Sequence, residues 1–119
     1  MFDSYDSYAI TQQIRPGLYL GAIDVVHQNF EGHANLCVVD YDPPVPKWAT
    51  VYKRITLEDD EGLNENKVRQ LILEGVQFIE ENISKGGVVV NCAMGVSRSA
   101  TMVIAYLMKS EKLEYERAF

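Results

Sequence analysis

The chain is poor in cysteine, in basic residues and in long apolar runs. Only 2 of its 119 residues are cysteine, too few for the disulfide framework that supports many small secreted domains. No uninterrupted apolar stretch approaches the roughly 20 residues that a helix needs to cross a bilayer. The first residues also lack the basic start and apolar run of a secretory signal. These absences predict a protein of the cytoplasm or nucleus, where the compartment is reducing.

Acidic residues outnumber basic ones. The chain has 11 Lys and Arg against 17 Asp and Glu, a formal net charge of -6. Because such a surface repels phosphodiester backbones and anionic lipid headgroups, neither nucleic acid nor a membrane is expected as a partner. What remains is an ordinary globular composition, 47% hydrophobic and 24% charged, sufficient for one domain with a single core.

The distribution of polar and apolar residues predicts a short tail followed by one α/β domain. Residues 1–13 are predicted to be a flexible tail, and the domain is expected to span residues 14–119. Strands alternate with helices along the domain, which favours a three-layer arrangement with a largely parallel central sheet flanked by helices. The expected strands are 18–20, 36–39, 51–55 and 88–90, and the expected helices are 64–84, 99–108 and one beginning near residue 113.

The most informative segment runs from the valine strand 88–90 through a short loop into an apolar helix. Cys92 follows the strand, and Arg98 and Ser99 stand where the helix begins. Backbone N–H groups of a loop between a strand and a helix can form a nest for an anion, and the helix dipole adds positive charge. The residues between the cysteine and the arginine, which we expect to form such a phosphate-binding loop with Arg98, are Ala93, Met94, Gly95, Val96 and Ser97.

The residue types in this segment suit nucleophilic chemistry on a phosphate. The nest would stabilise a Cys92 thiolate, the form of cysteine that attacks. The planar guanidinium of Arg98 can bind two phosphate oxygens, and Gly95 supplies backbone freedom at the bend. Ser99 can donate its hydroxyl proton to the Cys92 sulfur when that sulfur becomes a leaving group. The alternative is a buried structural cysteine in an ordinary turn, because free cysteine is among the most buried residue types.

This pattern of cysteine, five residues, arginine and serine resembles the signature of cysteine-dependent protein tyrosine phosphatases. Residues 88–101 together with 105–108 are similar to the small, atypical-type dual-specificity phosphatases of that superfamily. Residues 17–21 resemble the first strand of the family, and residues 52–59 resemble the strand that leads to its general-acid loop. The resemblance implies a protein-tyrosine-phosphatase-like fold.

The resemblance also implies a metal-independent hydrolysis without cofactor. Cys92 would attack the phosphoester of a phosphorylated protein, and a carboxylic acid would protonate the leaving oxygen before water releases phosphate from the cysteinyl-phosphate. Asp59 matches the family acid by position, and Asp60 is the alternative; without the cysteine loop, this acidic cluster would be interpreted as a solvated loop. A shallow site is expected to admit phosphotyrosine and phosphoserine or phosphothreonine alike.

Two features depart from the family pattern. Asn91 stands directly before the cysteine, where relatives usually carry histidine, and an amide can donate a hydrogen bond but carries no charge. Slower turnover with the chemistry retained is therefore expected. Relatives also continue past the helix that begins near Leu113, so the domain is expected to be short at its C-terminal side. Self-association through an uncovered surface there is one expectation.

Three functions remain open from the sequence. The first is an active dual-specificity phosphatase. The second is a phosphate-binding pseudophosphatase or adaptor with little turnover, which Asn91 and the short C-terminal side favour, whereas Cys92, Arg98, Ser99 and Asp59 oppose it. The third is a phospholipid or RNA 5′-phosphatase with the same chemistry, because the cysteine loop specifies the bond that is cleaved better than the molecule that carries it.

Overall fold

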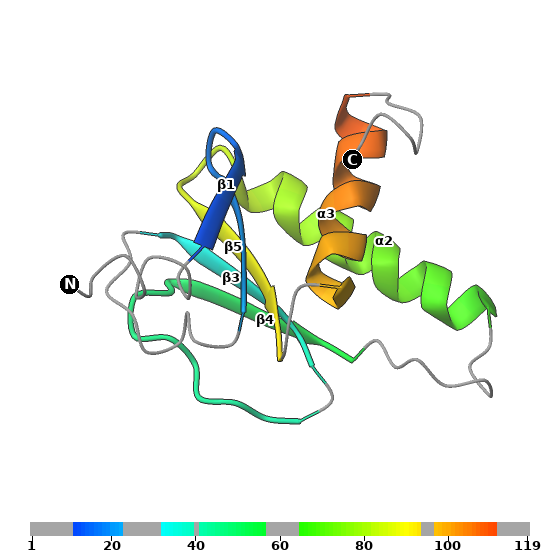
Figure 1. Cartoon of the computed structure of the whole chain (residues 1–119), viewed down its shortest axis with the longest axis horizontal. Coiled ribbons are helices and arrows are strands. Elements are labelled where there is room, and N and C mark those ends of the chain that lie inside the picture. The colour runs from blue at the N-terminus through cyan, green and yellow to red at the C-terminus, as the bar shows by residue number, and fades with distance from the viewer. Residues whose placement is uncertain (1–10, 23–31, 40, 57–64, 94–96, 112–119) are drawn as a thin grey trace.

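The computed structural model describes residues 11–22, 32–39, 41–56, 65–93 and 97–111 of the chain. Five strands and two helices lie within these ranges (Figure 1). In chain order they are β1 (Thr11–Arg15), β2 (Leu18–Ala22), β3 (Ala34–Val38), β4 (Val51–Ile55), α2 (Glu65–Asn82), β5 (Val88–Cys92) and α3 (Ser97–Ser110).

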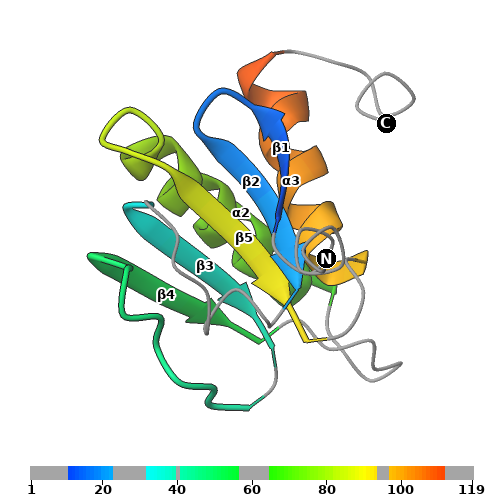
Figure 2. The ribbon, with the colours of Figure 1, turned by 60° about the vertical axis from the view of Figure 1, so that its left-hand side comes forward.

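The strands form one sheet in the order β1-β2-β5-β3-β4 (Figure 2). The pairs β2·β5, β5·β3 and β3·β4 are parallel, and only the edge strand β1 is antiparallel to its neighbour. The prediction of a mixed α/β fold with a largely parallel central sheet is therefore confirmed. β4 has the bounds expected from the sequence, whereas β1 was not predicted and begins inside the segment 1–13 that was expected to be a tail.

The turn between β1 and β2 depends on a glycine. Gly17 has a φ of 83°, in the left-handed region that residues with a side chain rarely adopt. Its carbonyl oxygen accepts a hydrogen bond of 2.8 Å from the Val88 N–H at the start of β5. The Pro16-Gly17 turn therefore both reverses the chain and fixes the start of the central strand.

Both described helices pack on the same face of the sheet (Figures 1 and 2). Because side chains alternate along a strand, Val88, Val90 and Cys92 of β5 point to this face and join the apolar core. Helix α2 carries the expected apolar stripe, and α2 and α3 approach each other closely at Gly75 and Met102. The other core side chains are Leu18, Ala34, Leu36, Val38, Ile55, Phe78, Ile79, Val103 and Leu107.

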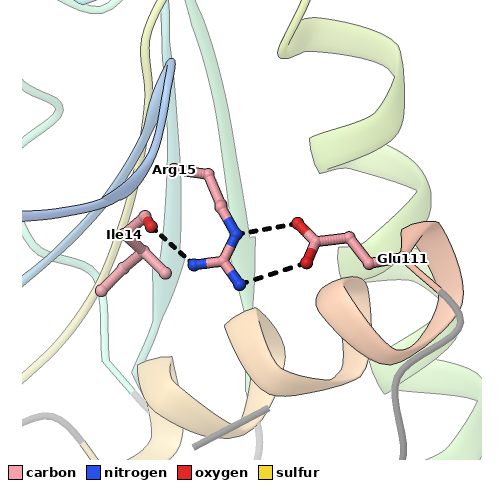
Figure 3. Close-up of polar contacts among 3 residues, drawn as sticks. All are labelled: Ile14, Arg15 and Glu111. Carbon is pink, nitrogen blue, oxygen red and sulfur yellow. Dashed lines mark hydrogen bonds and ion pairs between the residues drawn. The ribbon is translucent and has the colours of Figure 1, made fainter. Parts of the chain in front are cut away.

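An ion pair joins the C-terminal end of α3 to β1, the antiparallel edge strand of the sheet. Arg15 of β1 forms a two-pronged ion pair with Glu111, at 2.9 Å and 3.1 Å (Figure 3). A third guanidinium N–H donates to the Ile14 carbonyl oxygen at 2.8 Å.

Neither helix in the described part of the chain is long and apolar enough to span a membrane. The helix expected from residue 113 lies outside the described residues.

Candidate active site

The loop that follows Cys92 leaves the sheet at its carboxyl edge. β5 is the central strand, with parallel neighbours β2 and β3 on either side, and it ends at Cys92. Helix α3 begins at Ser97, so the chain passes from strand end to helix start over a few residues (Figure 2). The carboxyl edge beside a central parallel strand is the common location of ligand sites in open α/β sheets.

Cys92 and Ser99 meet across this junction. The Cys92 Sγ and the Ser99 Oγ lie 3.4 Å apart and share a hydrogen bond. Both residues are buried, with 2% and 0% of their surface exposed. Because a thiolate carries no proton, the serine hydroxyl must be the donor whenever the sulfur is ionised. This geometry places one hydrogen-bond donor beside the sulfur on the side of the helix.

The first turn of α3 is positively charged. Arg98 is the second residue of the helix and is partly exposed, and no acidic residue stands in that turn. Acidic side chains usually occupy such positions because they offset the partial positive charge of the exposed N–H groups. Arg98 forms no ion pair with a carboxylate of the described residues. The helix start therefore combines a partial positive charge with a full one, and both favour an anion there.

Asn91 turns away from this junction. As the neighbour of Cys92 in an extended strand, it points to the opposite face of the sheet, where it is buried. Its Oδ1 accepts a hydrogen bond of 2.7 Å from the Asn35 Nδ2, and its Nδ2 donates to the Cys37 Sγ at 3.7 Å. The residue that replaces the family histidine is thus held by side chains of β3.

Asn35 is a residue that the sequence reasoning missed. It is the second residue of β3 and has 1% of its surface exposed, and its Nδ2 also donates to the Val89 carbonyl oxygen at 3.0 Å. The available signal was a single amide within the otherwise apolar run 34–39. A buried amide in a central strand needs partners, because an unpaired one costs about 1–3 kcal/mol.

Several predicted site residues lie outside the described part of the chain. These are the two candidates for the general acid, Asp59 and Asp60, and the middle of the loop, Met94, Gly95 and Val96. Ala93 follows β5 directly, and Ser97 is the first residue of α3. Within the described ranges, no three His, Cys, Asp or Glu residues are grouped as metal ligands would be.

The model of the dual specificity phosphatase catalytic domain family matches residues 23–119. The chain belongs to this family. It is 31% identical over 116 residues to the MAP kinase phosphatase with leucine-rich repeats protein 3 of Dictyostelium discoideum, covering 92% of this chain and 13% of that protein. It is 34% identical over 113 residues to the dual specificity protein phosphatase 1B of Arabidopsis thaliana, covering 89% and 65%.

Solved structures share the fold. The human tyrosine phosphatase-like serine/threonine/tyrosine-interacting protein superposes with a TM-score of 0.76 and 26% identity, over 93% of this chain and 80% of that one. This dual-specificity phosphatase domain spans 13% of the length of the leucine-rich-repeat MAP kinase phosphatase of Dictyostelium discoideum, and 27% of the length of a probable dual specificity protein phosphatase of the same organism to which it is 34% identical over 111 residues. The family assignment therefore concerns a domain that also occurs within longer proteins.

Proposed function

We propose that this chain is a dual-specificity protein phosphatase that works through a cysteinyl-phosphate intermediate and without a metal ion. The observation that carries the proposal is the hydrogen bond between Cys92 and Ser99, formed where β5 ends and the cationic start of α3 begins. A nucleophile at that position faces the place where an anion is best stabilised.

In the first step, the Cys92 thiolate attacks the phosphorus of a phosphate monoester. An S–P bond forms while the P–O bond to the leaving group breaks, and Arg98 binds two of the phosphoryl oxygens in its planar fork. Asp59 supplies the proton that the leaving oxygen takes, with Asp60 as the alternative acid; both roles rest on the family resemblance. The leaving alcohol or phenol departs neutral.

In the second step, water attacks the phosphorus and the S–P bond breaks. The carboxylate formed in the first step accepts the proton of that water, as microscopic reversibility requires. The electron pair of the broken bond returns to the Cys92 sulfur, and Ser99 donates its hydroxyl proton into a hydrogen bond with the emerging thiolate. Inorganic phosphate and the free enzyme are the products.

The substrates we propose are phosphotyrosine and phosphoserine or phosphothreonine in proteins. The loop interior carries no lysine that would favour a more highly charged phosphate ester. One relative is named a MAP kinase phosphatase, so phosphorylated MAP kinases are the first substrates to try. A reducing compartment, the cytoplasm or nucleus, keeps the nucleophile as a free thiol.

An adaptor with little turnover is the second candidate. One observation favours it: a structural neighbour is described as a phosphatase-like interacting protein. An adaptor of this kind would bind a phosphorylated segment at Arg98 and the start of α3 without breaking the ester bond.

The deciding experiment measures hydrolysis of a small aryl phosphate in the presence of a metal chelator. We expect activity in the wild type, none with Cys92→Ser, and a loss of at least about tenfold with Arg98→Lys, because lysine lacks the planar fork. Arg69→Lys, at an exposed position of α2, is the matched control and keeps full activity. Equal, background-level hydrolysis in wild type and Cys92→Ser, together with retained phosphopeptide binding, would identify the adaptor instead.

A further inference from the structure

The buried amide of Asn35 occupies an unusual position in the sheet. It lies on β3, the parallel neighbour of the strand that ends at the nucleophile, and on the face opposite to the two helices. The β3 residues adjacent to it along the chain, Ala34 and Leu36, belong to the apolar core. An amide at such a site loses its hydration, and only well-formed hydrogen bonds offset that loss.

Both amide protons of Asn35 are used on β5. One goes to the Val89 carbonyl oxygen at 3.0 Å and the other to the Asn91 Oδ1 at 2.7 Å. Because Asn35 presents only donors to Asn91, the Asn91 amide must turn its oxygen toward Asn35. Its nitrogen then faces Cys37, which accepts at 3.7 Å. The orientation of Asn91 is therefore set from the neighbouring strand.

Asn91 shares a peptide bond with Cys92. Holding the Asn91 side chain on one face of the sheet limits rotation of the backbone that carries the nucleophile on the other face. Ser99 contacts the sulfur from the helix side. The last residues of β5 are thus fixed from both faces, immediately before the loop that must present N–H groups to an anion.

The stability of the fold does not by itself require the hydrogen-bonded pair of Asn35 and Asn91. When both members of a buried hydrogen-bonded pair are replaced by apolar residues of similar shape, stability changes little. We infer that Asn35 is a positioning residue for the nucleophile: through its hydrogen bond to Asn91 it orients the backbone on which Cys92 and the phosphate-binding loop depend. This inference deepens the proposed function and rests on it.

The test compares three variants with a matched control. Asn35→Leu leaves the Asn91 Oδ1 without its donor, and Asn91→Leu leaves one Asn35 amide proton without its acceptor, whereas the double variant removes both amides. Asn82→Leu is the control, because Asn82 is also a buried amide that donates a hydrogen bond, at 2.8 Å to the Phe78 carbonyl oxygen, but lies at the end of α2. Melting temperature, kcat, KM and the rate of Cys92 alkylation at one fixed pH are measured for each.

We expect each single variant to lower kcat about tenfold or more with KM within about twofold, because a small misplacement of reacting groups slows chemistry more than binding. The double variant should regain a melting temperature close to that of the wild type while kcat stays low. Asn82→Leu should lower the melting temperature but not kcat. Wild-type kcat in the double variant, or an equal kcat loss in Asn82→Leu, would overturn the inference.

Alkylation separates this inference from the proposed function. Loss of Asn35 should slow iodoacetamide modification of Cys92, located by mass spectrometry, because a misplaced loop stabilises the thiolate less. Simple loosening of the fold would instead expose Cys92 and speed its modification. If the wild type hydrolyses nothing but Asn35→Leu still slows alkylation, the phosphatase proposal fails and the positioning role stands. If the wild type is active and Cys92 of Asn35→Leu is alkylated at an unchanged or higher rate, the phosphatase proposal stands and the positioning role fails.

Discussion

Cys37 and Cys92 lie on neighbouring parallel strands, but their side chains point to opposite faces of the sheet. Cys37 pairs in register with Asn91, one residue before Cys92, and successive residues of a strand alternate between faces. Both are free thiols. We therefore do not expect Cys37 to serve as a resolving thiol for oxidised Cys92, since sulfurs whose Cβ vectors diverge cannot be joined without backbone movement.

The first prediction concerns oxidation. Treatment with hydrogen peroxide should convert Cys92 to the sulfenic acid, which dimedone traps, without forming a Cys37–Cys92 disulfide. Peptide mapping under non-reducing conditions checks the outcome, and a reduced sample serves as the control. Recovery of a peptide that links the two cysteines would show that β3 and β5 rearrange in solution.

The second prediction concerns Ser99. Replacing it with alanine removes the hydroxyl 3.4 Å from the Cys92 sulfur. A hydrogen bond to a charged group contributes about 1.5–3 kcal/mol, so release of the thiolate should slow by about tenfold to a hundredfold. Rapid-mixing kinetics should then show a burst of aryl alcohol followed by slow turnover. Ser110→Ala, at the exposed end of the same helix, is the control, and a Ser99→Ala variant with unchanged kcat would contradict the proposed role.

The third prediction concerns the crossing of α2 and α3. A methyl group at Gly75 would lie 2.6 Å from the Met102 Sδ and 3.4 Å from the Ile55 Cδ1. Met102 is fully buried, so it has little room to move. Gly75→Ala should lower the free energy of unfolding by about 1–2 kcal/mol, because overpacking outweighs the gain in helix propensity.

Urea denaturation measures that effect. Gln70→Ala, at an exposed position of α2, is the control and should change stability little. Shortening the neighbour as well, in Gly75→Ala/Met102→Ala, removes the steric clash, and the two changes should then cost less than the sum of their separate effects. A more stable Gly75→Ala single variant would show that α3 moves away from α2 without cost.

The fourth prediction concerns alkaline pH. Burial raises the pKa of the Tyr52 phenol above its ordinary value of 10.0, and the neighbouring Cys37 adds to this. Below pH 10 the phenol is protonated in both the folded and the unfolded chain. Above pH 10 the unfolded chain loses the proton while the folded one keeps it, so stability should fall as pH rises.

Tyr52→Phe tests the origin of that fall. The Tyr52 hydroxyl is buried and has no well-formed hydrogen bond to any described residue, so its removal should leave stability at pH 7 unchanged or slightly increased. The variant should also lose less stability than the wild type between pH 9 and pH 11, which denaturation at each pH measures. Parallel pH profiles for the two proteins would place the titrating group elsewhere, with Cys37 the next to test, because burial raises the pKa of its thiol.

The sequence predicted the central strand and the two helices well, because each depends on a local pattern. The run of three valines predicted β5, and apolar residues that recur every three or four positions predicted α2. The edge strand β1 was missed because its residues are polar and its partner is the next strand, which no periodicity within residues 11–15 reveals. Asn35 was missed for a related reason: its partner Asn91 is 56 residues away.

The sequence by itself determined the order of the reactive residues along one short segment: a cysteine follows a strand, and an arginine and a serine stand at the start of a helix. That order follows from covalent spacing and local backbone preferences. The tertiary structure alone decided which buried groups meet, because strand register fixes the partner and the face of every side chain. For this reason Cys37 lies away from Cys92, while Asn35 reaches the residue that precedes it.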